Sequence, residues 1–148
     1  MKTLIIYKSI HLGSTKKIAE ALGKALQADV FDAKDITAND FDSYDLIGIG
    51  SGIYDGGFHK AIDHLIDKVP GFEGKKIFLF STAGVIYDAS HREIRNKLMD
   101  KQADIIGDYY CKGLNKNSFL KYIGGMNKGR PNASDIERAK EFARKLIN

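Results

Sequence analysis

Residues 4–22 read LIIYKSIHLGSTKKIAEAL, and this stretch decides the expected fold. Its apolar start is typical of a buried β-strand, and from Ile18 onward apolar residues recur at helical spacing. A short polar loop, residues 9–15, joins the two. Backbone N–H groups at a helix start, together with the positive end of the helix dipole, attract a phosphate dianion. The stretch therefore predicts a strand, an anion-binding loop and a helix in immediate succession.

The loop has the residue types that such a site requires. Ser9, Ser14 and Thr15 offer hydroxyl groups, and Gly13 lets the backbone close around an anion. Between residues 3 and 17 there is no acidic side chain. A single glycine excludes both the P-loop and the dinucleotide fingerprint. The expected ligand is a mononucleotide-type phosphate; the alternative is that Ser14 or Thr15 serves only as a helix N-cap.

The composition is that of one globular domain. With 148 residues, 43% of them hydrophobic, the chain can bury a full core, so we expect a single domain over 1–148. No apolar run approaches the roughly 20 residues of a membrane span. The first expected strand leaves no room for a signal peptide, and the single cysteine, Cys111, cannot form an internal disulfide. These features favour the cytoplasm, with Cys111 as a buried thiol.

Apolar periodicity predicts alternating strands and helices. Strands are expected at 2–7, 29–32, 45–50, 77–80 and 104–112, and helices at 14–27, 58–68 and 91–101. The polar residues 33–43 fit either a loop or a turn or two of helix. A final helix is expected with a capping box of Ser134 and Glu137 and an apolar stripe that includes Ile147. This alternation predicts an α/β fold, with a five-stranded parallel sheet in the doubly wound order 2-1-3-4-5 and helices on both faces.

Three loops are expected to converge at one edge of that sheet. They follow the first, third and fourth expected strands, at residues 9–15, 51–57 and 81–87, and all are rich in Gly, Ser and Thr. Any one of them fits ordinary turn chemistry. Together they suit a flat ligand, because glycines let the backbone approach its edge and the rings of Tyr54 and Tyr87 can stack on its faces.

These residues resemble a known family. Residues 7–20 are similar to the phosphate loop of flavodoxins, and residues 50–54 and 81–84 resemble the flavin-contacting loops of a short flavodoxin-domain subfamily. Residues 123–132 resemble that subfamily's approach to its last helix. The resemblance implies a flavodoxin-like three-layer αβα sandwich that binds FMN non-covalently. The phosphate would lie on the first loop and the isoalloxazine ring between the second and third.

The resemblance also implies which residues bind FMN. His11 would replace a donor that the usual phosphate loop has and this chain lacks, and the absence of tryptophan leaves Tyr54 and Tyr87 as the stacking candidates. The fifth expected strand has no inserted loop, which indicates the short-chain type. The full expected set is Ser9, His11, Leu12, Gly13, Ser14, Thr15, Ser51, Gly52, Ile53, Tyr54, Thr82, Ala83, Gly84 and Tyr87.

For such a protein we expect electron transfer. The flavin would do the chemistry, and the protein would set its potential and expose its edge to partners. The alternative is an FMN-dependent oxidoreductase resembling the menaquinone-dependent protoporphyrinogen oxidases, since Phe58-His59 stands where those enzymes have an aromatic–His pair. The insertion that they carry near the last strand is missing here. A phospho-receiver domain is excluded, because Lys8-Ser9 and Gly50-Ser51 stand where it needs acidic residues.

Charge indicates the class of partner. The net charge is +4, unlike the usual acidic flavodoxin, and one stretch holds five basic residues and no acid: Lys112, Lys116, Lys121, Lys128 and Arg130. No nucleic-acid motif accompanies them, so we expect redox partners with acidic docking surfaces and no nucleic acid. The oligomeric state has no sequence signal. His59, His64 and His91 lack metal-ligand spacing, which predicts surface or helix-end roles and no metal site.

Overall fold

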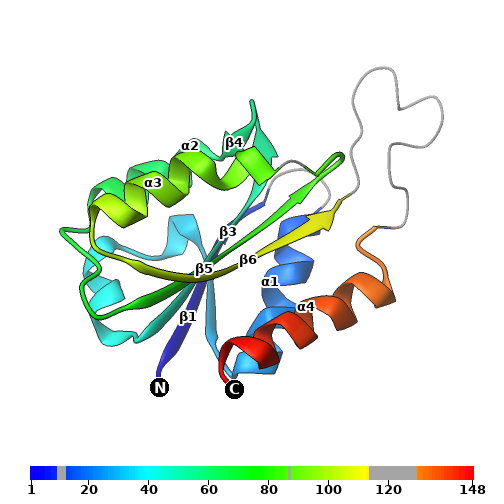
Figure 1. Cartoon of the computed structure of the whole chain (residues 1–148), viewed down its shortest axis with the longest axis horizontal. Helices are drawn as coiled ribbons and strands as arrows, with labels where there is room; N and C mark the ends of the chain where they lie inside the picture. Colours follow the sequence, from blue (N-terminus) through cyan, green and yellow to red (C-terminus); the bar gives the residue numbers. More distant parts are fainter. Residues whose placement is uncertain (10–12, 87, 114–129) are drawn as a thin grey trace.

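A parallel sheet forms the middle layer of the computed structural model, which describes residues 1–9, 13–86, 88–113 and 130–148 (Figure 1). The sheet order is β2-β1-β3-β5-β6, which confirms the expected order once β5 and β6 are counted as the fourth and fifth long strands. One short strand, β4, was not expected and pairs antiparallel with the end of β3. The strand bounds are β1 Thr3–Lys8, β2 Asp29–Asp32, β3 Leu46–Tyr54, β4 Gly57–Phe58, β5 Lys76–Ala83 and β6 Asp104–Lys112.

Helices cover both faces of the sheet, as Figure 1 shows. On one face, α1 (Ser14–Leu26) and α4 (Ala133–Leu146) pack in one hydrophobic cluster with alternate side chains of the strands. On the other, α2 (Lys60–Asp67) and α3 (Arg92–Asp100) pack in a second cluster. Three short 3-10 helices, η1 Ala33–Asp35, η2 Ala38–Ser43 and η3 Asp88–His91, complete the connections. Over the described ranges, no helix combines the length and the apolar character needed to cross a membrane.

The alternation of the central strands produces the two clusters. Leu4 and Ile6 of β1 are fully buried on the α2 and α3 side, whereas Ile5 is fully buried on the α1 and α4 side. Gly48 and Gly50 of β3 lie under the rings of Phe78 and Phe80, which a Cβ at either glycine would overlap. The glycines in this strand therefore make room for aromatic side chains of the neighbouring strand.

The helix boundaries differ from expectation at two places. A helix was expected to begin at residue 58, but Phe58 belongs to β4. The helix α2 begins at Lys60, with His59 as its N-cap. The capping box of α4 consists of Asn132 and Asp135, not Ser134 and Glu137. Asn132 Oδ1 accepts from Asp135 N at 3.0 Å, and Asp135 Oδ2 accepts from Asn132 N at 2.8 Å. These bonds start the helix earlier than expected.

The apolar stripe of α4 ends sooner than the sequence pattern indicates. Ala139 and Ala143 are fully buried in the cluster with α1, but Ile147 lies beyond the helix end and is 47% exposed.

Candidate functional site

The start of α1 is open in the way an anion site requires. Gly13 is the N-cap residue, with a left-handed backbone (φ 72°) that glycine adopts without strain. It has no side chain that could accept from the first amides of the helix, and no described atom lies within 4 Å of the position that its Cβ would take. The first turn carries Lys16 and Lys17 and no acid. Backbone donors and the positive end of the helix dipole therefore meet at this point, with no acidic side chain in the first turn.

The end of β5 packs directly against this helix start. The hydroxyls of Thr15 and Thr82 are 2.7 Å apart in a hydrogen bond, and both side chains are buried. Gly113, which follows β6, comes equally close: a Cβ there would lie 3.0 Å from Cβ of Ser14 and 3.2 Å from Cβ of Thr82. Gly113 also donates its N–H to the carbonyl of Ala83 at 2.9 Å. Sequence reasoning missed Gly113, because only the register of β6 against β5 reveals its position.

The second expected loop is instead a β-hairpin. Residues 51–54 continue β3, and the pairs Ile53–Phe58 and Tyr54–Gly57 join them to β4. Asp55 and Gly56 form the turn with positive φ values of 51° and 80°, as in a two-residue type I′ turn. The Asp-Gly pair is the sequence signal that was overlooked. The expected boundary at residue 50 was wrong because Ser51 still pairs with both β1 and β5, and Gly52 still pairs with β5.

Within the hairpin, Tyr54 folds back over the strand. Its hydroxyl lies against Gly52, where a Cβ would clash with it, and its ring meets the ring of His59 edge-on at 5.3 Å. Gly52 is therefore required for the position that Tyr54 takes. Tyr54 lies at the carboxyl end of β3, close to the flat-ligand position expected of it.

His59 links the hairpin to α2. Its Nδ1 accepts from Ala61 N at 2.9 Å, so the neutral ring carries its proton on Nε2. Its backbone N–H donates to Ser51 Oγ, whose hydroxyl donates to the carbonyl of Gly52. Burial, and then the charge of Lys8, lower the pKa of His59, which keeps the ring neutral at pH 7. The expected helix-end role of His59 is confirmed.

The third expected loop also begins later than expected. Residues 81–83 belong to β5 and pair with β6, and Ser81 and Thr82 pair with β3 as well. Their polar composition resembled a turn, but both neighbouring strands supply backbone partners as far as Thr82. Gly84 follows the strand, and Val85 and Ile86 are exposed there. Of the remaining expected site residues, Ser9 directly follows β1, while His11, Leu12 and Tyr87 lie outside the described residues; so do Lys116, Lys121 and Lys128.

A buried polar chain lies beneath the end of β5. His91 is 1% exposed, with Nε2 at 2.7 Å from Ser81 Oγ and Nδ1 at 2.8 Å from Asp108 Oδ1. The ring stacks on Tyr110 at 4.0 Å and meets Phe58 edge-on at 5.2 Å. His91 is the N-cap residue of α3, so the expected helix-end role is confirmed, but the side chain is buried and not on the surface. Ser81 and Asp108 lie on different strands, and no local pattern brings them to His91.

The hydrogen-bonded residues Ser81, His91 and Asp108 follow the order of a hydrolase catalytic triad, but a substrate has no access to the serine. Burial would raise the pKa of Asp108, but hydrogen bonds from His91 and Arg95 hold it below its usual range. The ionised carboxylate accepts from His91 Nδ1–H, and Nε2 of the same ring is hydrogen-bonded to the hydroxyl of Ser81. Ser81 is 2% exposed on a central strand, so no substrate can reach its Oγ. The chain fixes the start of α3 to β5 and β6, and is structural.

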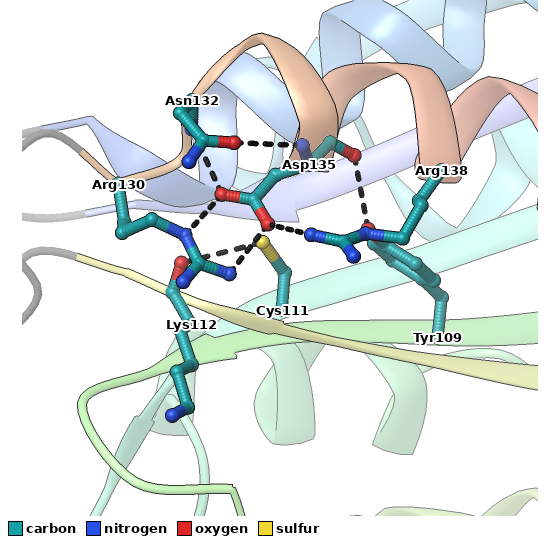
Figure 2. A network of polar contacts seen from close by, with 7 residues as sticks. All are labelled: Tyr109, Cys111, Lys112, Arg130, Asn132, Asp135 and Arg138. Atoms are coloured by element: carbon teal, nitrogen blue, oxygen red, sulfur yellow. Dashed lines mark hydrogen bonds and ion pairs between the residues drawn. The ribbon is translucent and has the colours of Figure 1, made fainter.

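A second polar network joins α4 to the end of β6 (Figure 2). The Asp135 side chain is 2% exposed and accepts from Arg130, from Arg138 Nη2 at 3.1 Å and from the N–H of Asn132. Burial would raise the pKa of Asp135, but these partners, Arg130 first among them, lower it. Tyr109 Oη donates to the carbonyl of Asp135 at 3.0 Å.

Cys111 lies below this network in Figure 2. It is a buried free thiol, as expected, and its Sγ donates to the carbonyl of Lys112. Burial raises the pKa of Cys111 to about 11, so it stays protonated and unreactive at pH 7. In the part of the chain that the structure describes, no group of three or more His, Cys, Asp or Glu residues could hold a metal ion.

The family model described as a flavodoxin domain matches residues 4–117, which contain the three expected loops and Gly113. The chain belongs to the flavodoxin domain family. An uncharacterized protein of Methanocaldococcus jannaschii is 44% identical to this flavodoxin-domain protein over 149 residues, covering 99% of each chain.

Solved structures share the fold of this flavodoxin-domain protein. Oxidised flavodoxin 1 from Bacillus cereus superposes with a TM-score of 0.76 at 17% identity, covering 99% of this chain and 97% of the other. A flavodoxin from the domain Archaea gives 0.71 at 18% identity, with full coverage of both chains. At these identities the likeness establishes the three-layer architecture, and the site has to be argued from this chain's own residues.

Proposed function

We propose that this flavodoxin-domain protein binds FMN non-covalently and carries electrons. The observation that supports this most is the start of α1, where Gly13 caps the helix without a side chain and Thr15 is held by Thr82. A phosphate dianion suits this place, since it takes amide and hydroxyl donors, gains from the helix dipole and meets no carboxylate in the first turn. The residues present therefore fit an FMN phosphate.

The remaining contacts follow from the ends of β3 and β5. Ser51, Gly52, Ile53 and Tyr54 would hold one side of the isoalloxazine ring, and Thr82, Ala83 and Gly84 the other. Ser9, Ser14, His11 and Leu12 would complete the phosphate site, and Tyr87 the second ring face. When bound, FMN accepts and donates one or two electrons. The protein would exclude water from part of the ring and leave one edge for partners.

The same proposal covers the setting of the protein. The whole chain, 1–148, would act as one domain in the cytoplasm, and its partners would be redox proteins that present acidic surfaces to it. The net charge of +4 supports the second point, because complementary charge steers the encounter of electron-transfer partners.

The first test is flavin uptake. The purified protein, stripped of any ligand and mixed with FMN, is expected to bind it with a micromolar or lower dissociation constant and to quench its fluorescence. FAD is expected to bind more weakly, because the site offers a single phosphate loop. Protein that takes up no FMN under these conditions would contradict the proposal. Steady oxidation of protoporphyrinogen by the loaded protein alone would indicate the oxidoreductase instead of the carrier.

The second test removes one hydroxyl from the phosphate site. Thr15→Val keeps the side-chain volume but leaves Thr82 without its 2.7 Å partner and the phosphate without one donor. We expect the affinity for FMN to fall by about 1–3 kcal/mol, roughly 5- to 150-fold. Fluorescence titration measures this. Thr3→Val, the same change at a buried position at the opposite end of β1, is the control and should bind FMN like the wild type. Equal affinity in all three proteins would place the phosphate elsewhere.

A further inference from the structure

A recess lies at the carboxyl end of β6, beside the segment that follows β5. Its volume is about 340 Å³, and its lining includes Ile86, Tyr110, Lys112, Arg130 and Arg138. Ile86 comes two residues after Gly84 of the proposed flavin site, so the recess adjoins that site. The recess is not used by the proposed FMN contacts, which lie at the ends of β1, β3 and β5.

The lining of the recess carries excess positive charge. Asp135 is its one acidic lining residue among those described. The Asp135 carboxylate already accepts four hydrogen bonds: two from Arg130, one from Arg138 and one from the backbone N–H of Asn132. A carboxylate has about four acceptor positions, so this one is saturated. One carboxylate balances one of the two arginines, and Lys112 adds a further charge. The recess thus attracts anions.

The cations are held in place before any ligand arrives. Arg130 meets Asp135 through two of its nitrogens, a fork that fixes the guanidinium plane, and it is 27% exposed. Arg138 bonds to the same carboxylate and is 58% exposed. Side chains that are already ordered lose less entropy when a ligand binds. The arginines therefore offer a preformed cationic wall with one side open to solvent.

The positive charge lies on both sides of an edge strand. β6 ends the sheet, and over the described residues no further strand pairs with its outer edge. Figure 2 shows the arginines on one side of β6, with the side chain of Lys112 pointing the other way. An edge strand presents backbone donors and acceptors to an added strand, whose successive side chains point alternately to the two sides. This arrangement suits an extended acidic chain better than a small anion.

We propose that this recess is a docking surface for an extended, glutamate- or aspartate-rich segment of a redox partner, which lies along the edge of β6. The carboxylates meet Arg130 and Arg138 on one side and Lys112 on the other, and exposed Val85 and Ile86 add an apolar contact. The inference rests on the proposed function, since it places the partner beside the proposed flavin. Docking itself does not require flavin to be bound.

The experiment uses the full chain, with and without FMN, and a short peptide of glutamates flanking a central valine. Backbone amide shifts in a two-dimensional NMR titration are expected to move at Ile86, Tyr110 and Lys112, and added salt should weaken binding. The double variant Lys112→Gln/Arg138→Gln should bind the peptide with about tenfold lower affinity, since two partly exposed charges are lost. Both side chains are on the surface, and Asp135 keeps Arg130 in the double variant, so the variant should fold. Arg144→Gln, on the same helix but outside the recess, is the control.

Several outcomes overturn the inference: equal binding of a lysine peptide of the same length, shifts confined to another face, or no effect of the double variant. Succinate binding as tightly as the peptide would show a small-anion site and would also overturn it. Failure of FMN to bind while the peptide binds as expected would refute the proposed function and leave the docking surface standing.

Discussion

Replacing His91 by alanine is expected to lower the free energy of unfolding by about 3–5 kcal/mol. The imidazole is 1% exposed, and its removal leaves a cavity between Tyr110 and Phe58. It also leaves the buried hydroxyl of Ser81 without the partner that it has at 2.7 Å. Both effects act in a fully packed region that cannot easily collapse. Urea unfolding followed by circular dichroism measures the change.

Two further variants separate the causes. His91→Phe fills the cavity but restores no hydrogen bond, so it should recover only part of the loss. His64→Ala, at an exposed position on α2, is the control and should change the stability by less than about 0.5 kcal/mol. If His91→Ala were as stable as the wild type, the chain from Ser81 to Asp108 would be an incidental arrangement with no part in holding the start of α3.

Replacing Asp135 by asparagine is expected to cost about 2–3 kcal/mol at pH 7. Asparagine has nearly the same shape, but its amide cannot balance Arg130 and Arg138 and cannot accept on both of its terminal atoms. The capping bond from Asn132 N weakens at the same time. The loss should appear as a lower urea midpoint with an unchanged slope, because the compactness of the fold does not change.

The cost should depend on pH in a definite direction. The pKa of Asp135 is lower in the folded protein than in the unfolded chain, where it is about 3.9. Its contribution is therefore present above that value and is lost as the pH falls through the folded pKa. The difference between wild type and Asp135→Asn should shrink from about pH 5 downward. Asp108 titrates equally in both proteins, so the difference isolates Asp135.

Asp42→Asn changes an exposed residue of η2 and is the matched control. It should leave the free energy of unfolding unchanged across this pH range. A difference between wild type and Asp135→Asn that stayed constant down to about pH 3 would mean that charge at Asp135 is not what stabilises the network.

Some features of the protein could be read from the sequence because they depend on neighbours along the chain. The strands at 29–32 and 104–112 have the expected bounds, and α1 begins at the expected Ser14. Strict alternation of strands and helices in one chain leaves few topologies, which is why the sheet order could also be predicted. Gly13 belongs to this group as well, since a glycine between a strand and a helix is a local signal.

The ends of β3 and β5 could not be predicted in this way. Ser51, Gly52, Ser81 and Thr82 look like turn residues, and they stay in strands because neighbouring strands continue beside them, on both sides for all but Gly52, which pairs with β5 alone. How far a strand continues in a parallel sheet depends on how far its neighbours extend beside it and supply backbone partners, which the residues of that strand alone do not show. The same holds for Gly113, which is needed only because β6 passes close to Ser14 and Thr82.

By itself, then, the sequence determined the class of fold, the order of the strands and the glycine at which α1 begins, all of which follow from periodicity and local turn chemistry. Only the tertiary structure decided that His91 is buried between Ser81 and Asp108, because these residues come from different elements. It also showed that α4 is capped by Asn132 and Asp135 and not by the expected Ser134 and Glu137. Contacts between residues far apart in the sequence decide structural features that the local sequence pattern leaves open.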